Sequence, residues 1–309
     1  MAARNAFADM SARRLVVLGT ERSGTTWVAR ALASADRAIY VHEPDNGDAN
    51  PLASDGKRGL GLYPVLDAGE RVPRYARLWD HAFAGGWPSL PSVARVGIAV
   101  NRLPPLPRDL VARAAARVLH RSRVTETIVA KTVHAPFALD WLIDRYHPMI
   151  VVVRRDPRNV VASLLRLGTT PAGVEDRFRA LRHPAVRSRY LDPAGLEPPG
   201  PSESMAYRLA WWIAFIDRLL TDRANAEGWV VVSHDKMCAS PLLEAERLCD
   251  AFDVGDRAGM MRFISASDRP GDGYSTDRLT AIQPQRWKDM LDPRQVAQVH
   301  SAVASVTSR

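Results

Sequence analysis

The pattern of hydrophobic and polar positions predicts several short, buried strands. Three runs are rich in β-branched residues and lack polar alternation: Leu15–Leu18, Met149–Val153 and Trp229–Val232. Thr127–Ala130 is a fourth candidate. Such runs are typical of strands in a parallel sheet that helices cover on both faces.

Helical periodicity follows several of these strands. Apolar residues recur at helical spacing in the segments Thr26–Ala35, Pro136–Tyr146, Asn159–Leu167 and Leu242–Phe252. A longer stripe between Ser204 and Arg223 predicts one amphipathic helix. Strands and helices that alternate in this way predict an α/β fold with three layers and a central, mainly parallel sheet. A chain of 309 residues suits a single domain of this kind over residues 1–309.

Two segments interrupt the alternation of strands and helices. Residues 44–107 and 168–204 are rich in proline and glycine, and the first also carries Trp79 and Trp87. Aromatic side chains in a loop-rich segment indicate packing, so we expect both segments to be inserts or lids that shape a substrate pocket. Residues 1–12 contain no apolar core and are expected to form a flexible arm.

The charge of the chain favours anionic ligands. Its 42 basic residues outnumber its 34 acidic residues and give a net charge of +8. Most of the basic residues are arginines, whose planar fork binds two oxygens of a phosphate or sulfate group. Because they are scattered and no zinc spacing or basic–aromatic motif accompanies them, nucleic acid is not an expected partner.

Cysteine content and hydropathy indicate the compartment. Cys238 and Cys249 are the only cysteines, and two reduced thiols in a cytoplasmic protein are expected. No apolar run reaches the ~20 residues that span a bilayer, so stable membrane insertion is not expected. The sequence leaves the oligomeric state open, and a homodimer is compatible with it.

The segment Gly19–Trp27, with the sequence GTERSGTTW, is predicted to be a phosphate-binding turn between a strand and a helix. Gly24 permits a sharp turn, backbone amides and the helix start attract an anion, and Thr25 and Thr26 add hydroxyl donors. The ATPase and GTPase loop has the pattern GxxxxGK[ST], but here Thr25 stands in the place of the lysine. The basic residue, Arg22, instead precedes the glycine by two positions.

A second anion-binding motif follows the strand Met149–Val153. The sequence there is RRDPRNVVAS, in which Asp156 and Pro157 predict a turn and a helix start. Ser163 lies eight residues after Arg155, about two helical turns along. Both side chains are therefore expected to reach one phosphate, and the two motifs together indicate a ligand with two separated phosphate groups.

These motifs resemble those of the sulfotransferases that use 3′-phosphoadenosine 5′-phosphosulfate (PAPS). The family's first loop is a basic residue followed by SGTTW, which matches Arg22–Trp27, and its second motif is Arg-x-Pro with a serine eight residues after the arginine. A weaker similarity covers Val230–Pro241. The resemblance implies a P-loop-like sulfotransferase fold and the transfer of a sulfuryl group from PAPS, without a metal, to a hydroxyl of a small molecule, natural product or glycan. An arginine at position 22, where animal enzymes have lysine, is typical of bacterial relatives.

The resemblance also implies which residues bind the donor. They are Arg22, Ser23, Gly24, Thr25, Thr26, Trp27, Arg155, Ser163 and, from a loosely similar loop near the C-terminus, Arg278. Trp27 would stack on adenine, although core packing at the helix start is an alternative for this side chain. Arg286 and Lys288 are further candidates in the C-terminal loop.

Two residues are candidates for the base that takes the proton from the hydroxyl of the acceptor. VAKTVHAP resembles the family's Lys-Thr-His-x-Pro segment, with one extra residue before His134, and Lys131 would be a second cation near the sulfuryl group. Glu43, which follows His42 after a predicted strand, is the other candidate base. Capping a helix is the structural alternative for His134, and pairing with an arginine is the alternative for Glu43. Arginine stays protonated, so Arg22 is expected to stabilise charge rather than donate a proton.

Two other functions remain open from the sequence. A nucleotide or small-molecule kinase of the P-loop type shares the strand, loop and helix that bind phosphate. A nucleotide-binding protein without catalysis would keep the fold alone. The missing GK[ST] sequence disfavours the kinase, and the presence of Arg22, Lys131 and His134 together disfavours the non-catalytic protein.

Overall fold

A parallel five-stranded sheet forms the centre of the molecule. The computed structural model describes residues 12–35, 38–86, 127–254, 256–271 and 275–308, with isolated positions between 103 and 114. The strands are β1 (Arg13–Gly19), β2 (Ala38–His42), β3 (Thr127–Lys131), β4 (Met149–Arg154) and β5 (Val230–Ser233). Their order is β2-β3-β1-β4-β5, and every adjacent pair is parallel. The predicted strands and their parallel arrangement are confirmed.

Side chains of β1 alternate between two apolar layers. Val16 and Leu18 belong to one buried cluster, whereas Leu15 and Val17 belong to another on the opposite face. All four are at most 2% exposed. Because successive side chains of a strand point to opposite faces, a strand that is apolar throughout must be covered on both sides. The predicted three-layer α/β fold is therefore confirmed.

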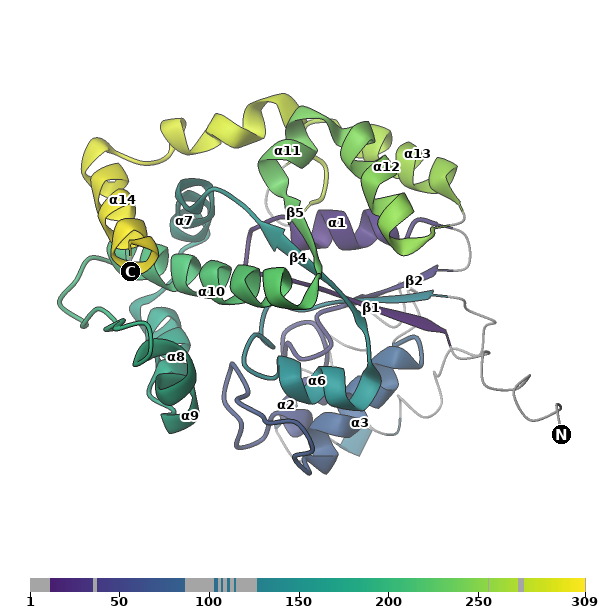
Figure 1. Ribbon diagram of the computed structural model, residues 1–309, viewed down its shortest axis with the longest axis horizontal. Helices are drawn as coiled ribbons and strands as arrows, with labels where there is room; N and C mark the ends of the chain where they lie inside the picture. Colours follow the sequence, from purple (N-terminus) through teal and green to yellow (C-terminus); the bar gives the residue numbers. More distant parts are fainter. Residues whose placement is uncertain are drawn as a thin grey trace, which may run out of the picture.

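Helices cover both faces of the sheet (Figure 1). One face carries α1 (Thr25–Leu32), α11 (His234–Ala239), α12 (Pro241–Phe252) and α13 (Arg257–Ser267). The other carries α2 (Leu52–Gly56), α3 (Pro73–Phe83), α6 (Leu139–Tyr146), α7 (Pro157–Arg166), α8 (Pro171–Leu181), α9 (Pro184–Val186), α10 (Met205–Glu227) and α14 (Pro293–Thr307). A π-helical turn (Arg187–Leu191) follows α9, and the 3₁₀ segment η2 (Thr280–Asp289) precedes α14. None of the helices in the described part of the chain combines the length and hydrophobicity that a bilayer span requires.

The five predicted helices are present as α1, α6, α7, α10 and α12, with bounds that differ by a few residues. The segments 44–86 and 168–204, expected to be rich in loops, contain α2, α3, α8 and α9 as well. In α8, Thr170 accepts a hydrogen bond from the N–H of Gly173, and Pro171 takes the first helical position. Proline there initiates a helix rather than breaking one. Of the expected arm, only Ala12 is among the described residues. Trp87 also lies outside them.

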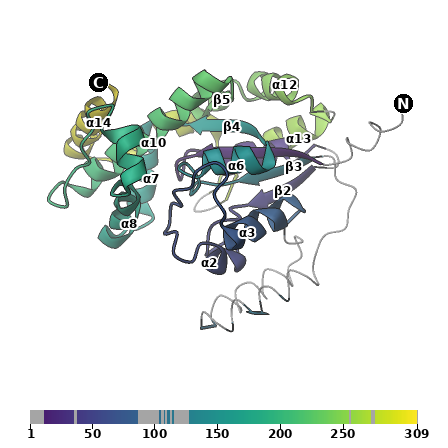
Figure 2. The same ribbon diagram turned by 60° about the horizontal axis from the view of Figure 1, so that its bottom comes forward.

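The order of the strands creates a crevice between the ends of β1 and β4. These strands are neighbours, but the helix that follows β1 covers one face of the sheet and the helix that follows β4 covers the other. Figure 2 shows the two helical layers on opposite sides of the strands. Loops that diverge in this way leave a crevice at the carboxyl ends of the strands, where open α/β sheets bind their ligands. Both predicted anion motifs follow these two strands.

Candidate active site

The turn after β1 is built around Gly24. This residue has a φ of +97°, in the left-handed region that strains residues with a Cβ. A Cβ at this position would also lie only 2.3 Å from Cδ2 of His234, the first residue of α11. Burial lowers the pKa of His234 to about 4, so the ring against the turn is neutral at pH 7. The backbone conformation and the contact with His234 therefore both require glycine.

The same turn presents backbone N–H groups at the start of α1. Gly24 caps this helix, so the N–H groups of Thr25 and Thr26 have no intrahelical carbonyl to bind. N–H groups in this position attract anions because they lie at the positive end of the helix dipole. The Ser23 hydroxyl instead donates to the carbonyl of Thr20 at 2.7 Å and stabilises the turn. Binding of a ligand through Ser23 stays a prediction.

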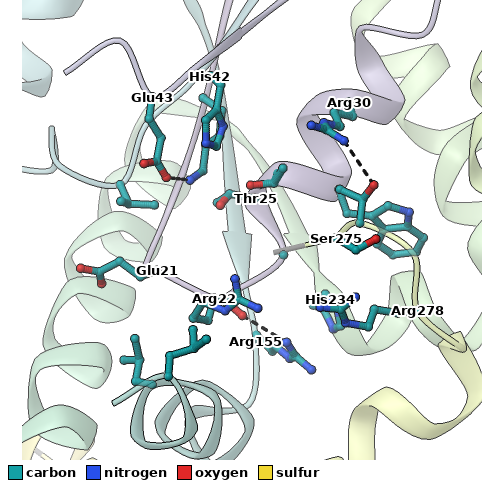
Figure 3. Close-up of a pocket in the computed structure, with 18 of the residues that line it drawn as sticks. Glu21, Arg22, Thr25, Arg30, His42, Glu43, Arg155, His234, Ser275 and Arg278 are labelled. Atoms are coloured by element: carbon teal, nitrogen blue, oxygen red, sulfur yellow. Dashed lines mark hydrogen bonds and ion pairs between the residues drawn. The ribbon is translucent and has the colours of Figure 1, made fainter. Parts of the chain in front are cut away.

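The two predicted anion motifs meet in space. Arg155 follows β4, and Asp156 caps α7 by accepting a hydrogen bond from the N–H of Arg158 at 2.8 Å. Nη1 of Arg155 donates to the carbonyl of Arg22 at 3.1 Å, as Figure 3 shows. Nε of Arg22 in turn donates to Oγ of Ser163 at 3.0 Å. Residues more than 130 positions apart in the chain thus form one basic cluster.

Arg22 and Arg155 line a cavity of about 720 Å³, which is within the range for a small-molecule site, whereas Ser163 is not among its described lining residues. In the view of Figure 3, Glu21 and Glu43 lie on one side of the cavity, and Arg30, His234, Ser275 and Arg278 lie on the opposite side. Arg22 and Arg155 lie between the two groups. The cavity therefore has one end rich in arginine and another that contains carboxylates.

Trp27 packs into the core next to the cavity. Its indole N–H donates to Oγ of Ser267 at 2.8 Å, and its ring lies edge-on to His234 with centroids 6.0 Å apart. The side chain is 8% exposed and contributes to the cavity wall. The structure thus shows the core packing that was the alternative for Trp27, while stacking on adenine stays a prediction.

Among the basic residues near the C-terminus, Arg278 lines the cavity. Its N–H donates to the carbonyl of Ser267 at 3.0 Å, which holds this loop against the end of α13. Arg286 and Lys288 lie further along in η2 and are not among the described residues that line the cavity. Of these three, Arg278 is therefore the one that lines the cavity, whereas Arg286 is close enough to Arg155 to help lower its pKa.

His134 is buried beside the end of β3 and lines the cavity from the carboxylate side. Its Nδ1 is enclosed and has no hydrogen-bond partner, so Nε2 is the ring nitrogen that reaches the cavity. The ring of Tyr63 packs edge-on against it, with centroids 5.3 Å apart. Burial lowers the pKa of His134 below its usual value of 6.5. The ring is therefore neutral at pH 7 and able to accept a proton.

Glu43 and Lys131 form a buried ion pair at the same end of the cavity. Although burial alone would raise the pKa of Glu43, the Lys131 ammonium and hydrogen bonds from Lys131 and Asn46 lower it to about 2. Glu43 also has a φ of +40°, and its N–H donates to the carbonyl of Lys131 at 2.8 Å. The carboxylate is thus firmly held, paired with a lysine rather than an arginine, and only weakly basic.

The Glu43–Lys131 pair should make the protein sensitive to acid. A carboxyl whose pKa is lowered by folding stabilises the native state above its unfolded pKa, and this contribution is lost as the pH falls through the folded value. For Glu43 the window runs from pH 4.5 down to about 2. We expect the free energy of unfolding to fall by about 3 kcal/mol across it, as measured by urea denaturation at a series of pH values.

The control for this prediction is a pair of single substitutions. Glu43→Gln should remove this part of the pH dependence, at the cost of a less stable protein because Lys131 is left buried without a partner. Asp192→Asn removes one carboxylate from an exposed pair with Arg187 and should leave the pH dependence as it is. An unchanged acid dependence in Glu43→Gln would contradict the stabilising role of the pair.

Three residues of the cavity region were missed by the sequence analysis. The carboxylate of Glu21, in the phosphate turn, accepts a hydrogen bond from the Tyr63 hydroxyl at 2.5 Å and pairs with Nη2 of Arg177 at 3.1 Å. Burial opposes ionisation of Glu21, but Arg177 and Tyr63 lower its pKa overall. Tyr63 and Arg177 come from the two insert segments, where no local pattern marked them. The sequence offered one signal, which was that Glu21 is an acidic residue inside a turn expected to bind anions.

No protein-family model matches the sequence, and no curated protein matches it. Among solved structures, the chain is similar to the sulfotransferase domain from the curacin biosynthetic pathway, with 12% identity and a TM-score of 0.47 over 95% of this chain and 98% of that one. The sulfotransferase domain from the Synechococcus PCC 7002 olefin synthase has 13% identity and a TM-score of 0.43, over 94% of each chain. Sulfotransferase STF9 from Mycobacterium avium has 16% identity and a TM-score of 0.40, over 91% of this chain and 77% of that one.

Proposed function

We propose that this protein transfers a sulfuryl group from PAPS to a hydroxyl of a small molecule, natural product or carbohydrate. One observation carries the proposal: the phosphate turn and the second anion motif contact each other in a cavity that also contains His134. Arg22 and Ser163, one residue from each motif, are 3.0 Å apart at Nε and Oγ. The motifs whose sequences resemble the sulfotransferase pattern are thus assembled at one site.

The residues of the cavity fit a donor with two phosphate-bearing positions. At the turn, the N–H groups of Thr25 and Thr26 have no intrahelical carbonyl to bind and would bind one phosphate. Nε of Arg155 is buried without a hydrogen-bond partner beside the turn, and such a group costs free energy unless a ligand or water binds it. Arg22 and the turn would hold one phosphate of the donor, Arg155 and Ser163 would hold the other, and Arg278 is a further candidate.

PAPS, when bound, supplies a sulfuryl group that an attacking hydroxyl accepts, with adenosine 3′,5′-bisphosphate as the leaving group. Nε2 of His134 would take the hydroxyl proton, since this ring is neutral at pH 7 and faces the cavity. Glu43 is a poorer base, because its pKa is about 2 and Lys131 already binds it. Arg22 stays protonated and would stabilise negative charge at the phosphate turn.

Calorimetry with the full chain tests the proposed donor. Adenosine 3′,5′-bisphosphate should bind without magnesium, and adenosine 5′-monophosphate should bind more weakly because it lacks the 3′ phosphate. Binding of ATP–Mg in place of the bisphosphate would favour the kinase. If the bisphosphate binds but PAPS is not consumed with any hydroxyl compound, the nucleotide-binding protein without catalysis is favoured. Failure of the bisphosphate to bind would reject the proposed function.

A further inference from the structure

The cavity separates its charges between two ends. The donor end, formed by α1, the residue after β4 and the segment 275–283, contains Arg30, Arg155 and Arg278 and no carboxylate among the described lining residues. The other end, here called the acceptor end, contains the carboxylates of Glu21 and Glu43. In Figure 3, Arg30 and Arg278 lie opposite Glu21 and Glu43, and Arg155 lies between the two groups.

Each cation at the acceptor end is already paired with a carboxylate. Lys131 pairs with Glu43, and Arg177 pairs with Glu21 at 3.1 Å. The side chains of Arg177 and Glu21 are 11% and 17% exposed, so water screens this pair little. Asp48 adds a third carboxylate to the wall. Among the described lining residues, Lys131 and Arg177 at the acceptor end are thus each compensated by a carboxylate.

Apolar side chains also line the cavity. They are Leu164 and Leu167, near the end of α7, and Val133, next to His134. They suit the hydrocarbon part of an acceptor whose hydroxyl reaches His134, since binding sites are mostly apolar with a few placed polar groups.

We infer that the acceptor is an alcohol or phenol that is neutral or carries an amino group, and that Glu21 sets this preference by neutralising Arg177. The inference rests on the proposed function. An acceptor with a carboxylate or phosphate would find Lys131 and Arg177 already paired and would place its charge near Asp48. Repulsive elements of this kind determine specificity as much as attractive ones do. Glu21 thus acts as a specificity-determining residue that need not take part in the transfer itself.

The test compares acceptors that differ only in charge. Two matched sets serve: tyrosol, tyramine and para-hydroxyphenylacetate, and the straight-chain compounds hexanol, aminohexanol and hydroxyhexanoate. Consumption of PAPS is followed by the release of adenosine 3′,5′-bisphosphate. For the wild-type chain we expect kcat/KM to be at least about tenfold lower for the anionic member than for the neutral or cationic members of the same set.

Two substitutions shift this ratio in opposite directions. Glu21→Gln frees the charge of Arg177 and should reduce the discrimination against anions by about tenfold, mainly through a lower KM for the anionic member. Arg177→Gln leaves Glu21 without its cation and should increase the discrimination. Asp176→Asn, which removes an exposed carboxylate paired with Arg179 on the same helix, is the matched control and should leave the ratio as it is. Either of the first two variants is sufficient if the other does not fold.

Each outcome decides the inference. A wild-type preference for the anionic members, or equal shifts in Glu21→Gln and Asp176→Asn, would overturn it. So would consumption of PAPS with the anionic members of both sets and with none of the neutral or cationic members. A protein that does not bind the bisphosphate fails the proposed function instead, and calorimetry on the same preparation separates the two failures.

Discussion

Replacement of His134 by alanine is expected to lower kcat by about 10²–10⁴-fold and to leave the affinity for adenosine 3′,5′-bisphosphate unchanged. The ring lies at the acceptor end, and it lines the cavity with its neutral Nε2 while the donor-binding residues lie elsewhere. Loss of a base affects the transfer step and not the binding of the donor. Steady-state kinetics with PAPS, together with calorimetry on the same variant, measure the two effects separately.

The pH profile identifies the base. Because burial lowers the pKa of His134, the wild-type activity should fall only on the acid side of pH 6.5, where the ring becomes protonated. His134→Ala should lose this limb of the profile. Glu43→Gln should keep it, since a carboxyl with a pKa of about 2 does not titrate in that range. Retention of the limb in His134→Ala and its loss in Glu43→Gln would assign the base to Glu43.

His42 provides the matched control for these kinetics. It is a second histidine that lines the cavity, but its Nδ1 is 2.6 Å from the Tyr40 hydroxyl and its side chain is exposed. His42→Ala should therefore have a much smaller effect on kcat than His134→Ala. Equal losses in the two variants would show that the effect of His134 reflects disturbance of the cavity as a whole.

The second large effect is expected at Arg155. Arg155→Gln should weaken the binding of adenosine 3′,5′-bisphosphate by about 10²–10³-fold, because a charge-assisted, bidentate contact in a poorly hydrated site is lost. Burial lowers the pKa of Arg155 only to about 10, so the guanidinium is charged at pH 7. The side chain also supports the phosphate turn through its bond to the carbonyl of Arg22. Calorimetry without magnesium measures the change.

Two further variants separate charge from geometry at this position. Arg155→Lys keeps the charge but loses the planar fork, so an intermediate affinity is expected. Arg158→Gln is the control: Arg158 lies three residues on, where it binds Asp156 and stacks over Trp287 outside the cavity wall. If Arg155→Gln and Arg158→Gln weaken binding equally, Arg155 has no special part in holding the donor.

The sheet and the phosphate turn were predictable from the sequence because both depend on local chemistry. Val16, Val17 and Leu18 are apolar without alternation, which is a direct consequence of burial on both faces. Gly24 was predictable for the same reason, since a sharp turn before a helix needs a residue that tolerates positive φ. The His234 ring beside Gly24 was not predictable, because His234 follows β5, which is two strands away from β1 in the sheet.

The charge pattern of the acceptor end was not predictable. Arg177 lies in a segment whose prolines suggested a loop, but Thr170 and Pro171 start a helix there and direct this arginine to the phosphate turn. The partner of Glu43 was uncertain for a similar reason. Glu43 and Lys131 are 88 residues apart in sequence and become neighbours only because β2 and β3 are adjacent in the sheet. Ion pairs between distant segments leave no periodic signal in a single sequence.

The bonds that join the phosphate turn to distant segments also set the order in which the protein can be completed on the ribosome. The hydrogen bond of the Trp27 indole requires Ser267, which is synthesised 240 residues later. At a synthesis rate of about 5–20 residues per second, this delay amounts to roughly 10–50 s. During that time β3, β4, β5 and α11 are synthesised one after another, so β1 and its turn gain their neighbours in steps. A nascent chain therefore cannot form the donor end until its last third has been translated, although β1 has both of its neighbouring strands once β4 has been made.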